Sequence, residues 1–258
     1  IYDDSFTKSL GLTNADGMQS FELGGEVFAR DLRIRHERAL TSEDSFTIVK
    51  TNSHLNLYSY FRQFSPKSIF EVGYFEGGSS VFIDRLFSPE HLTCVDNRKT
   101  RVTEVDNYID RQDRSPAMNV VHDFDQADAD GLRELADRHH SDGLDIVFDD
   151  ASHMYDQTKV TLSVLFPRLK PGGFYVIEDY GWVHSAAFQG ADHPWAELSG
   201  VSTLVFELIG VLANNSTVIQ DIYLDGGACV IRKGHAAITE PFEPLDRWAA
   251  RGKSIPVL

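Results

Sequence analysis

The chain has 258 residues, 42% of them hydrophobic, and a formal net charge of −15. That length and composition suit a single α/β domain with extensions. The acidic charge argues against nucleic-acid binding, which needs a basic surface, and favours a small-molecule partner.

The apolar runs are all shorter than 18 residues, and the first residues lack the pattern of a signal peptide. We therefore expect no membrane span and a cytoplasmic location. The sequence begins at Ile1 rather than Met, so a longer natural start remains open.

The first part of the chain predicts an N-terminal helical cap over residues 1–66. In residues 23–40, Phe28, Leu32 and Arg35 are spaced by three or four, which predicts a helix. Residues 51–64 predict a second helix. The short terminal segment 234–258 is expected to be a tail.

Residues 67–233 alternate short apolar runs with helical stretches, which predicts parallel strands joined by helical crossovers and hence an α/β, Rossmann-like sheet. Asp225-Gly226-Gly227 joins the last two strand-like runs. Such a turn is typical of a hairpin, so the sheet should end with an antiparallel strand. Cys94 and Cys229 lie within apolar runs and are expected to be buried thiols.

The segment EVGYFEGG, residues 71–78, joins a predicted strand to a predicted helix, as in nucleotide-binding sheets. A dinucleotide fingerprint would need glycine at position 75, where the chain has Phe75, so NAD binding is disfavoured. Asp96 ends the next strand, where a carboxylate can bind ribose hydroxyls. Asp125 and Gln126 follow the third strand and could meet the amine of adenine.

Two neighbouring strand ends carry acidic side chains. Asp149, Asp150 and His153 follow the strand 144–149, and Glu178 and Asp179 end the next one. Clustered carboxylates repel one another unless a cation lies among them, and oxygen ligands suit Mg²⁺. The alternative is structural: side chains alternate along a strand, so one acid of the second pair could be solvated, and the histidine could be a structural residue.

EVGYFEGG resembles the first motif of the class I S-adenosylmethionine-dependent methyltransferases. The resemblance implies that Gly73, Gly77 and Gly78 lie against the methionine part of the cofactor, with Asp96 on its ribose. It also implies an organising role for Glu71, and we assign Asp149 to the cofactor as well.

Residues 149–153, DDASH, and 175–180, YVIEDY, are similar to motifs of the antibiotic-sugar O-methyltransferases, a group also labelled cephalosporin-hydroxylase-like. This resemblance implies that Asp150, Glu178 and Asp179 bind magnesium and that His153 is the general base. HDFDQ, residues 122–126, is similar to the Gly-Asp-Gln of the group, which implies adenine contacts for Asp125 and Gln126. Phe124 and Ala151 replace glycines of the group's motifs.

The resemblance implies a deoxysugar acceptor, either a nucleotide-sugar such as TDP-rhamnose or a finished glycoside, and a homo-oligomer. Methylation of a catechol is the alternative, because a catechol also chelates Mg²⁺ through two oxygens. A non-catalytic cofactor-binding partner is an alternative of another class. The loop 181–199, rich in aromatic residues, is either a lid or sugar platform or ordinary packing, and His54 is a further possible substrate contact.

Overall fold

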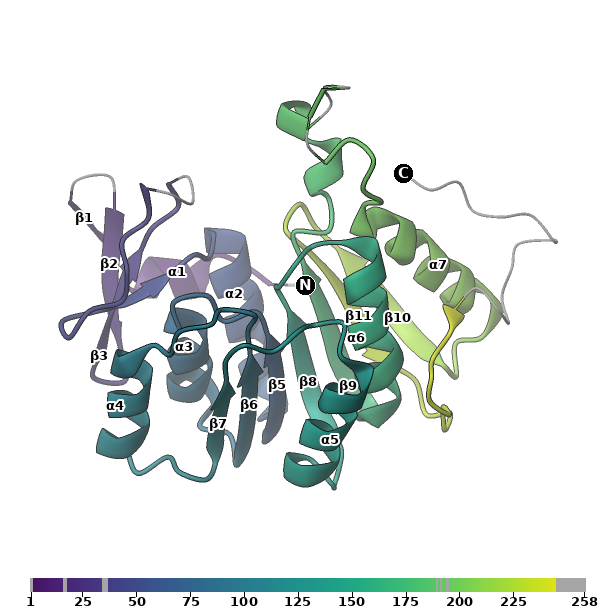
Figure 1. Cartoon of the computed structure of the whole chain (residues 1–258), viewed down its shortest axis with the longest axis horizontal. Helices are drawn as coiled ribbons and strands as arrows, with labels where there is room; N and C mark the ends of the chain where they lie inside the picture. Colours follow the sequence, from purple (N-terminus) through teal and green to yellow (C-terminus); the bar gives the residue numbers. More distant parts are fainter. Residues whose placement is uncertain are drawn as a thin grey trace. The chain divides into compact units, whose positions relative to one another are not determined.

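The computed structural model describes residues 2–15, 18–33, 37–188, 190, 192–193 and 195–244. Figure 1 shows its helices and strands. Its contacts divide the chain into two compact units. The first unit comprises Ile1–Lys67 with Tyr74–Asp123, and the second comprises Ser68–Gly73 with Phe124–Leu258. The expected tail, 234–258, lies largely outside the described residues, and the expected domain boundaries stay a proposal.

The first unit combines a small sheet, a strand pair and helices. Its four-stranded sheet has the order β1-β2-β3-β4, in which β1, β2 and β3 are antiparallel and β4 is parallel to β3. β6 and β7 form a parallel pair. The elements are α1 (Ser5–Ser9), β1 (Thr13–Ala15), β2 (Met18–Leu23), β3 (Glu26–Arg30), β4 (Phe46–Ile48), α2 (Asn52–Phe61), η2 (Arg62–Phe64), α3 (Gly78–Phe87), β6 (His91–Val95), α4 (Thr103–Arg111) and β7 (Met118–Val121).

The helix predicted over residues 23–40 is wrong, whereas the second N-terminal helix is confirmed as α2. Gly24 and Gly25 have φ of +60° and +83° and turn the chain from β2 into β3, a backbone that two-residue hairpins require. Residues 26–30 then alternate between buried and more exposed side chains, as a strand does. Arg35, which was part of the predicted helical spacing, lies outside the described residues.

An aromatic cluster holds the small sheet against α3. The ring of Phe82, on α3, makes edge contacts with the rings of Phe21 and Phe28, at centroid distances of 6.1 and 5.7 Å. The two sheet rings stack on each other at 5.1 Å. Edge-to-face pairs of this kind add about 0.5–1.5 kcal/mol beyond the area that they bury. The first unit therefore has a core of its own.

The second unit contains most of the central sheet. The seven strands of that sheet are divided between the units, with β10-β11-β9-β8-β5 here, in this order, and the pair β6-β7 in the first unit. β5, β8 and β9 are parallel, and β11 pairs antiparallel with both β9 and β10. The elements are β5 (Ser68–Val72), α5 (Ala129–His139), β8 (Leu144–Asp149), α6 (Tyr155–Arg168), β9 (Leu169–Glu178), η3 (Trp182–His184), η4 (Ala186–Phe188), α7 (Val201–Asn214), β10 (Ile219–Leu224) and β11 (Ala228–Lys233).

This arrangement confirms the predicted α/β class and the antiparallel end of the sheet. β5, β8 and β9 consist mainly of buried residues, as expected for parallel strands covered on both faces. Cys94 and Cys229 are both buried thiols, and burial raises the pKa of the Cys229 thiol. Among the described helices, none has the length and apolar character needed to cross a membrane.

Candidate active site

Gly73, the residue that follows β5, must be a glycine because the loop after β8 passes very close to it. Gly73 has a φ of +88°, and a Cβ added to it would lie 2.3 Å from the carbonyl oxygen of Asp150 and 2.6 Å from Cα of Ala151. Both the backbone conformation and the lack of space exclude a larger residue. The Asp150 amide also donates to the carbonyl of Val72, at 2.8 Å. Gly73 is thus in direct contact with Asp150 and Ala151, which begin the loop after β8.

The two other motif glycines form the N-terminus of α3. Gly77 is the N-cap residue, with φ +78°, and a Cβ there would lie 2.2 Å from a methyl carbon of Val105. A Cβ on Gly78 would lie 2.0 Å from the carbonyl oxygen of Thr47. A helix N-terminus bare of side chains leaves backbone N–H groups for a ligand. The predicted cofactor role of these glycines fits this geometry.

Asp96 lies next to the glycine loop. One of its carboxylate oxygens accepts from the Phe75 amide at 2.8 Å, and the other accepts from the Arg98 amide at 2.9 Å. The Arg98 guanidinium in turn donates to the Phe75 carbonyl and to the carboxylate of Glu76, each at 2.6 Å. Asp96 therefore fixes the turn of the glycine loop, and each oxygen keeps a lone pair that can accept from a ribose hydroxyl.

Asp149 and Gln126 meet in the interior of the second unit. The Gln126 side-chain amide donates to one Asp149 oxygen at 2.7 Å, and the Tyr175 hydroxyl donates to the other at 2.8 Å. Burial raises the pKa of Asp149 to about 7. The nearby Asp150 carboxylate also raises this pKa, whereas the hydrogen bonds that Asp149 accepts lower it. The carbonyl oxygen of the Gln126 side chain accepts from the Ser152 amide at 3.2 Å. These contacts hold Gln126 and Asp149 against the start of the loop that follows β8.

The sequence did not single out Tyr175. It lies inside the apolar run of β9, where a tyrosine is ordinary core, and only its hydrogen bond to Asp149 reveals a structural task. Asp125 is exposed and accepts from the Ala127 amide at 2.9 Å. Glu71 is buried on β5, in register with Phe148 of β8. The cofactor roles of Asp125, Gln126, Asp149 and Glu71 stay predictions.

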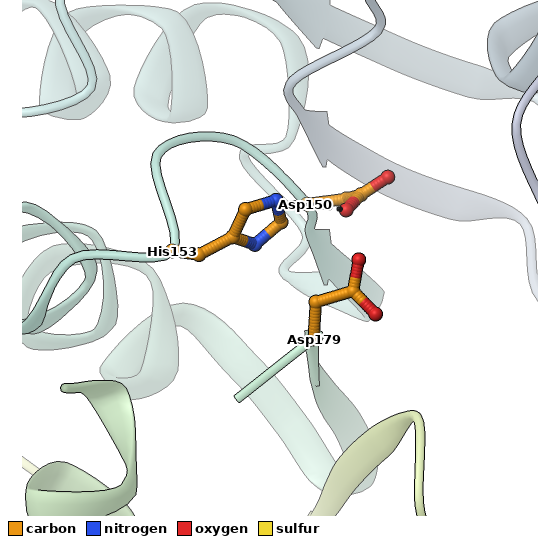
Figure 2. A group of neighbouring side chains, drawn as sticks. All are labelled: Asp150, His153 and Asp179. Carbon is orange, nitrogen blue, oxygen red and sulfur yellow. Dashed lines mark ion pairs between the residues drawn. The ribbon is translucent and has the colours of Figure 1, made fainter. Parts of the chain in front are cut away.

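Asp150, His153 and Asp179 form the cluster that could hold a metal ion (Figure 2). One ligand atom from each lies within 4.8 Å of the other two, and Nε2 of His153 is 3.6 Å from a carboxylate oxygen of Asp150. Neighbouring parallel strands bring them together, because β8 ends just before Asp150 and β9 just before Asp179. His153 and Asp179 have φ of +56° and +50°, so both turns are left-handed.

Glu178 does not belong to that cluster. It is the last residue of β9 and is 1% exposed, whereas Asp179 is exposed. Successive side chains along a strand point to opposite faces, which separates the two acids. The third position of the cluster is taken by His153, which was predicted as the base. The assignment of Glu178 as a ligand stays a prediction, without support from this geometry.

The cluster fits a hard divalent cation after a small adjustment. Mg²⁺ binds oxygen at about 2.1 Å, so two ligands opposite each other on an octahedron lie about 4.2 Å apart. The 4.8 Å limit within the cluster is slightly larger, and rotation of the exposed Asp179 side chain can close that gap. Two carboxylates also balance the charge of a divalent ion, which leaves open positions for water or an acceptor.

A cavity of about 360 Å³ adjoins the cluster and includes His153 and Asp179 in its lining. Its lining also includes aromatic residues of the loop that follows β9. The indole N–H of Trp182, in η3, donates to the carbonyl of His153 at 2.6 Å. The aromatic loop predicted near the site therefore lines it. His54 belongs to the first unit, where it is buried on α2.

Residues 70–180 match the family model of a methyltransferase domain. The match covers less than half of the chain. Its relatives include the 8-demethyl-8-alpha-L-rhamnosyl tetracenomycin-C 2'-O-methyltransferase of Streptomyces olivaceus, which is 43% identical over 94 residues, or 36% of this chain and 24% of that protein. The mycinamicin VI 2''-O-methyltransferase of Micromonospora griseorubida is 41% identical over 78 residues, 30% of this chain and 19% of that protein. Over these matched segments the chain thus resembles antibiotic-sugar O-methyltransferases, as predicted.

The fold of the methyltransferase domain agrees with that relationship. The solved MycE methyltransferase of the mycinamycin pathway, in complex with Mg, SAH and mycinamycin VI, superposes with a TM-score of 0.52 and 23% identity. The match covers 70% of this chain and 49% of that protein, so this chain spans about half of its length. At this identity the likeness establishes the Rossmann-like methyltransferase fold.

Proposed function

We propose that the chain is an S-adenosylmethionine-dependent and Mg²⁺-dependent O-methyltransferase that acts on a hydroxyl of a deoxysugar. The observation that carries the proposal is the cluster of Asp150, His153 and Asp179 beside a cavity large enough for a sugar ring. Relatives are named as methyltransferases of a rhamnosyl tetracenomycin and of an L-olivosyl-oleandolide, which favours a sugar acceptor. MycE, solved with Mg and SAH, supports the choice of metal and cofactor. A homo-oligomer stays a prediction from the sequence.

The residues of the chain divide the work of such a reaction. The loop Gly73–Gly78 and Asp96 hold the cofactor, and Asp150 and Asp179 hold the metal. When bound, S-adenosylmethionine supplies the methyl group, and Mg²⁺ makes a hydroxyl that it coordinates more acidic. A sugar hydroxyl is a weak nucleophile until its proton leaves. His153 accepts that proton at a ring nitrogen, and its Nε2 atom lies on the side of the Asp150 carboxylate.

The positioning of His153 is built into the backbone. Its left-handed φ of +56° aims the ring at Asp150, and the hydrogen bond from Trp182 fixes its carbonyl. A general base must lie within hydrogen-bond reach of the acceptor proton, and alignment of this kind contributes much of the rate.

Removal and return of the metal test the proposal. The protein is treated with EDTA and then incubated with S-adenosylmethionine and a panel of rhamnosides, TDP-rhamnose and catechol, with products read by mass. We expect a gain of one methyl group on a sugar only after Mg²⁺ is added back. Methylation that survives exhaustive chelation would show that the carboxylates are structural. If catechol were methylated and none of the sugars were, the acceptor would be a phenol and not a sugar.

A further inference from the structure

The loop that carries His153 is held by the start of α7. Met154 forms an isolated antiparallel bridge with Gly200, the residue before that helix, and the Tyr155 amide donates to the Ser199 carbonyl at 3.2 Å. The backbone on the C-terminal side of His153 is therefore paired with the residues that lead into α7. A change in this helix can thus move the imidazole, although the candidate metal cluster lies on the loops after β8 and β9.

The loop after β9 is held by the same part of α7. The Nε2 atom of His184 lies 3.0 Å from the hydroxyl oxygen of Ser202, in the first turn of the helix. Val183 packs so closely on Gly200 that a Cβ added there would lie 2.6 Å from one of its methyl carbons. The Trp182 indole joins this loop to the other, since it donates to the carbonyl of the proposed base at 2.6 Å. The two loops and the start of α7 thus form a closed set of contacts.

One ionisable side chain of α7 also contacts the loop after β8. Glu207 is the only charged residue among Val201–Asn214, and only 2% of its surface is exposed. The Tyr155 hydroxyl donates to its Oε1 atom, and Tyr155 is the first residue of α6, two positions after His153. Burial raises the pKa of both side chains, that of Tyr155 to about 12. A buried polar pair therefore joins α7 to the end of the loop that carries the proposed base.

Packing alone does not explain the buried glutamate. Its Oε2 atom has no hydrogen-bond partner among the described residues, so an apolar side chain would serve stability better. Lys159, one turn further along α6, donates to the Tyr155 hydroxyl oxygen at 3.4 Å, which leaves the hydroxyl proton for Glu207. A hydrogen bond depends on direction, whereas an apolar contact does not. The pair therefore fixes one orientation of the tyrosine and, with it, the start of α6.

We propose that Glu207 and Tyr155 are positioning residues that hold the His153 ring in place for the proton of the acceptor. The inference rests on the proposed function, in which that ring is the general base. His153 has a left-handed φ of +56°, so the direction of its ring depends on fixed backbone on both sides. The Asp150 amide, bonded to β5, fixes one side, and Tyr155 with Glu207 fixes the other. Displacement of a reacting group by about 1 Å can cost about 100-fold in rate.

Single-turnover rates of three variants test the inference. Tyr155→Phe removes only the hydroxyl, and we expect methyl transfer from S-adenosylmethionine to a rhamnoside, with Mg²⁺ present, to slow by about 10- to 100-fold. Glu207→Leu removes the acceptor of that hydroxyl and should slow the transfer to a similar extent. Glu207→Gln keeps an oxygen that accepts from Tyr155, so its rate should stay within about threefold of the unmodified protein. The affinity for SAH should change by less than about threefold in all three variants.

A double-mutant cycle shows whether the effect passes through His153. His153→Asn removes the ring that the pair is proposed to hold, and Asn tolerates the left-handed φ. Tyr155→Phe added to His153→Asn should lower the remaining rate by less than about twofold, because both changes act on one group. A further loss of about tenfold would mean that the hydroxyl acts on another group, and the inference would be wrong.

A matched variant and a measurement without turnover complete the test. The Tyr108 hydroxyl also donates to a buried carboxylate, that of Asp84 in the first unit, so Tyr108→Phe removes the same kind of bond and should leave the rate unchanged. Hydrogen exchange reports on the loop itself. Amides of residues 150–156 should exchange at least about tenfold faster in Tyr155→Phe and Glu207→Leu, but not in Glu207→Gln.

Two results would overturn the inference: a normal rate in Tyr155→Phe, or a rate in Glu207→Gln as low as in Glu207→Leu. Failure of the proposed function would look different. In that case hydrogen exchange in residues 150–156 would follow the expected order, but the unmodified protein would methylate no rhamnoside, or His153→Asn would keep its rate. Exchange and turnover together therefore show which of the two statements is wrong.

Discussion

Replacement of His153 by Asn separates the role of a base from that of a metal ligand. The residue has a φ of +56°, a conformation that Asn tolerates but that costs Ala about 1 kcal/mol. His153→Asn therefore removes the imidazole with little change in the backbone. The Nε2 atom of His153 lies 3.6 Å from a carboxylate oxygen of Asp150, beyond the usual hydrogen-bond limit of about 3.2 Å. Loss of a general base should lower kcat by about 10²- to 10⁴-fold, or about 3–5 kcal/mol.

Three measurements on His153→Asn check this reasoning. Single-turnover methyl transfer to a rhamnoside gives the rate, calorimetry gives the affinity for SAH, and electron paramagnetic resonance of bound Mn²⁺ gives the affinity for metal. We expect the rate to collapse while both affinities change by less than about threefold. His91→Asn, on the exposed first residue of β6, should leave all three values unchanged. A tenfold or greater loss of Mn²⁺ affinity would make His153 a ligand, and a nearly normal rate would remove it from the mechanism.

The cofactor loop and its glycine give two further predictions. Asp96→Ala should weaken SAH binding by about 1.5–3 kcal/mol in calorimetry, because it removes a charged hydrogen-bond acceptor and frees the Phe75 amide; unchanged affinity would exclude Asp96 from the cofactor site. Gly73→Ala should lower the free energy of unfolding by more than about 2 kcal/mol in urea titrations, since its Cβ would collide with the Asp150 backbone. Gly210→Ala, within α7 and with open space around it, should instead raise that free energy by about 0.5–1 kcal/mol, and equal effects at the two glycines would contradict this account.

The central sheet was predictable because its elements repeat a simple pattern. For buried strands such as β8, with helices between them, the period of the hydrophobic residues and the length of each apolar run are sufficient to predict the elements. The N-terminal sheet was not predicted because a spacing of three and four residues from Phe28 outweighed the Gly24-Gly25 turn. Two glycines with positive φ end any helix, whereas a few apolar residues fit either period by chance.

The site was predictable in its composition but not in its orientation. That acids after β8 and β9 meet at one edge follows from parallel pairing alone. Which acid of the pair Glu178 and Asp179 reaches the cluster depends on where the strand ends, and a shift of one residue reverses the answer. Left-handed backbone conformations at His153 and Asp179 then set the directions of both side chains. The sequence does not predict these conformations, because neither residue is a glycine.

The first glycine of the loop and the first acid of the candidate metal cluster follow one pair of strands. β5 and β8 pair in parallel up to Val72 and Asp149, and the ladder continues with the hydrogen bond from the Asp150 amide to the Val72 carbonyl. Gly73 then passes so close to Asp150 that even a methyl group would not fit. Gly73 and Asp150, the proposed metal ligand, are therefore held by backbone atoms rather than by flexible side chains. A methyl donor bound at Gly73 and an acceptor bound near Asp150 would share this rigid reference, which favours the in-line alignment that methyl transfer requires.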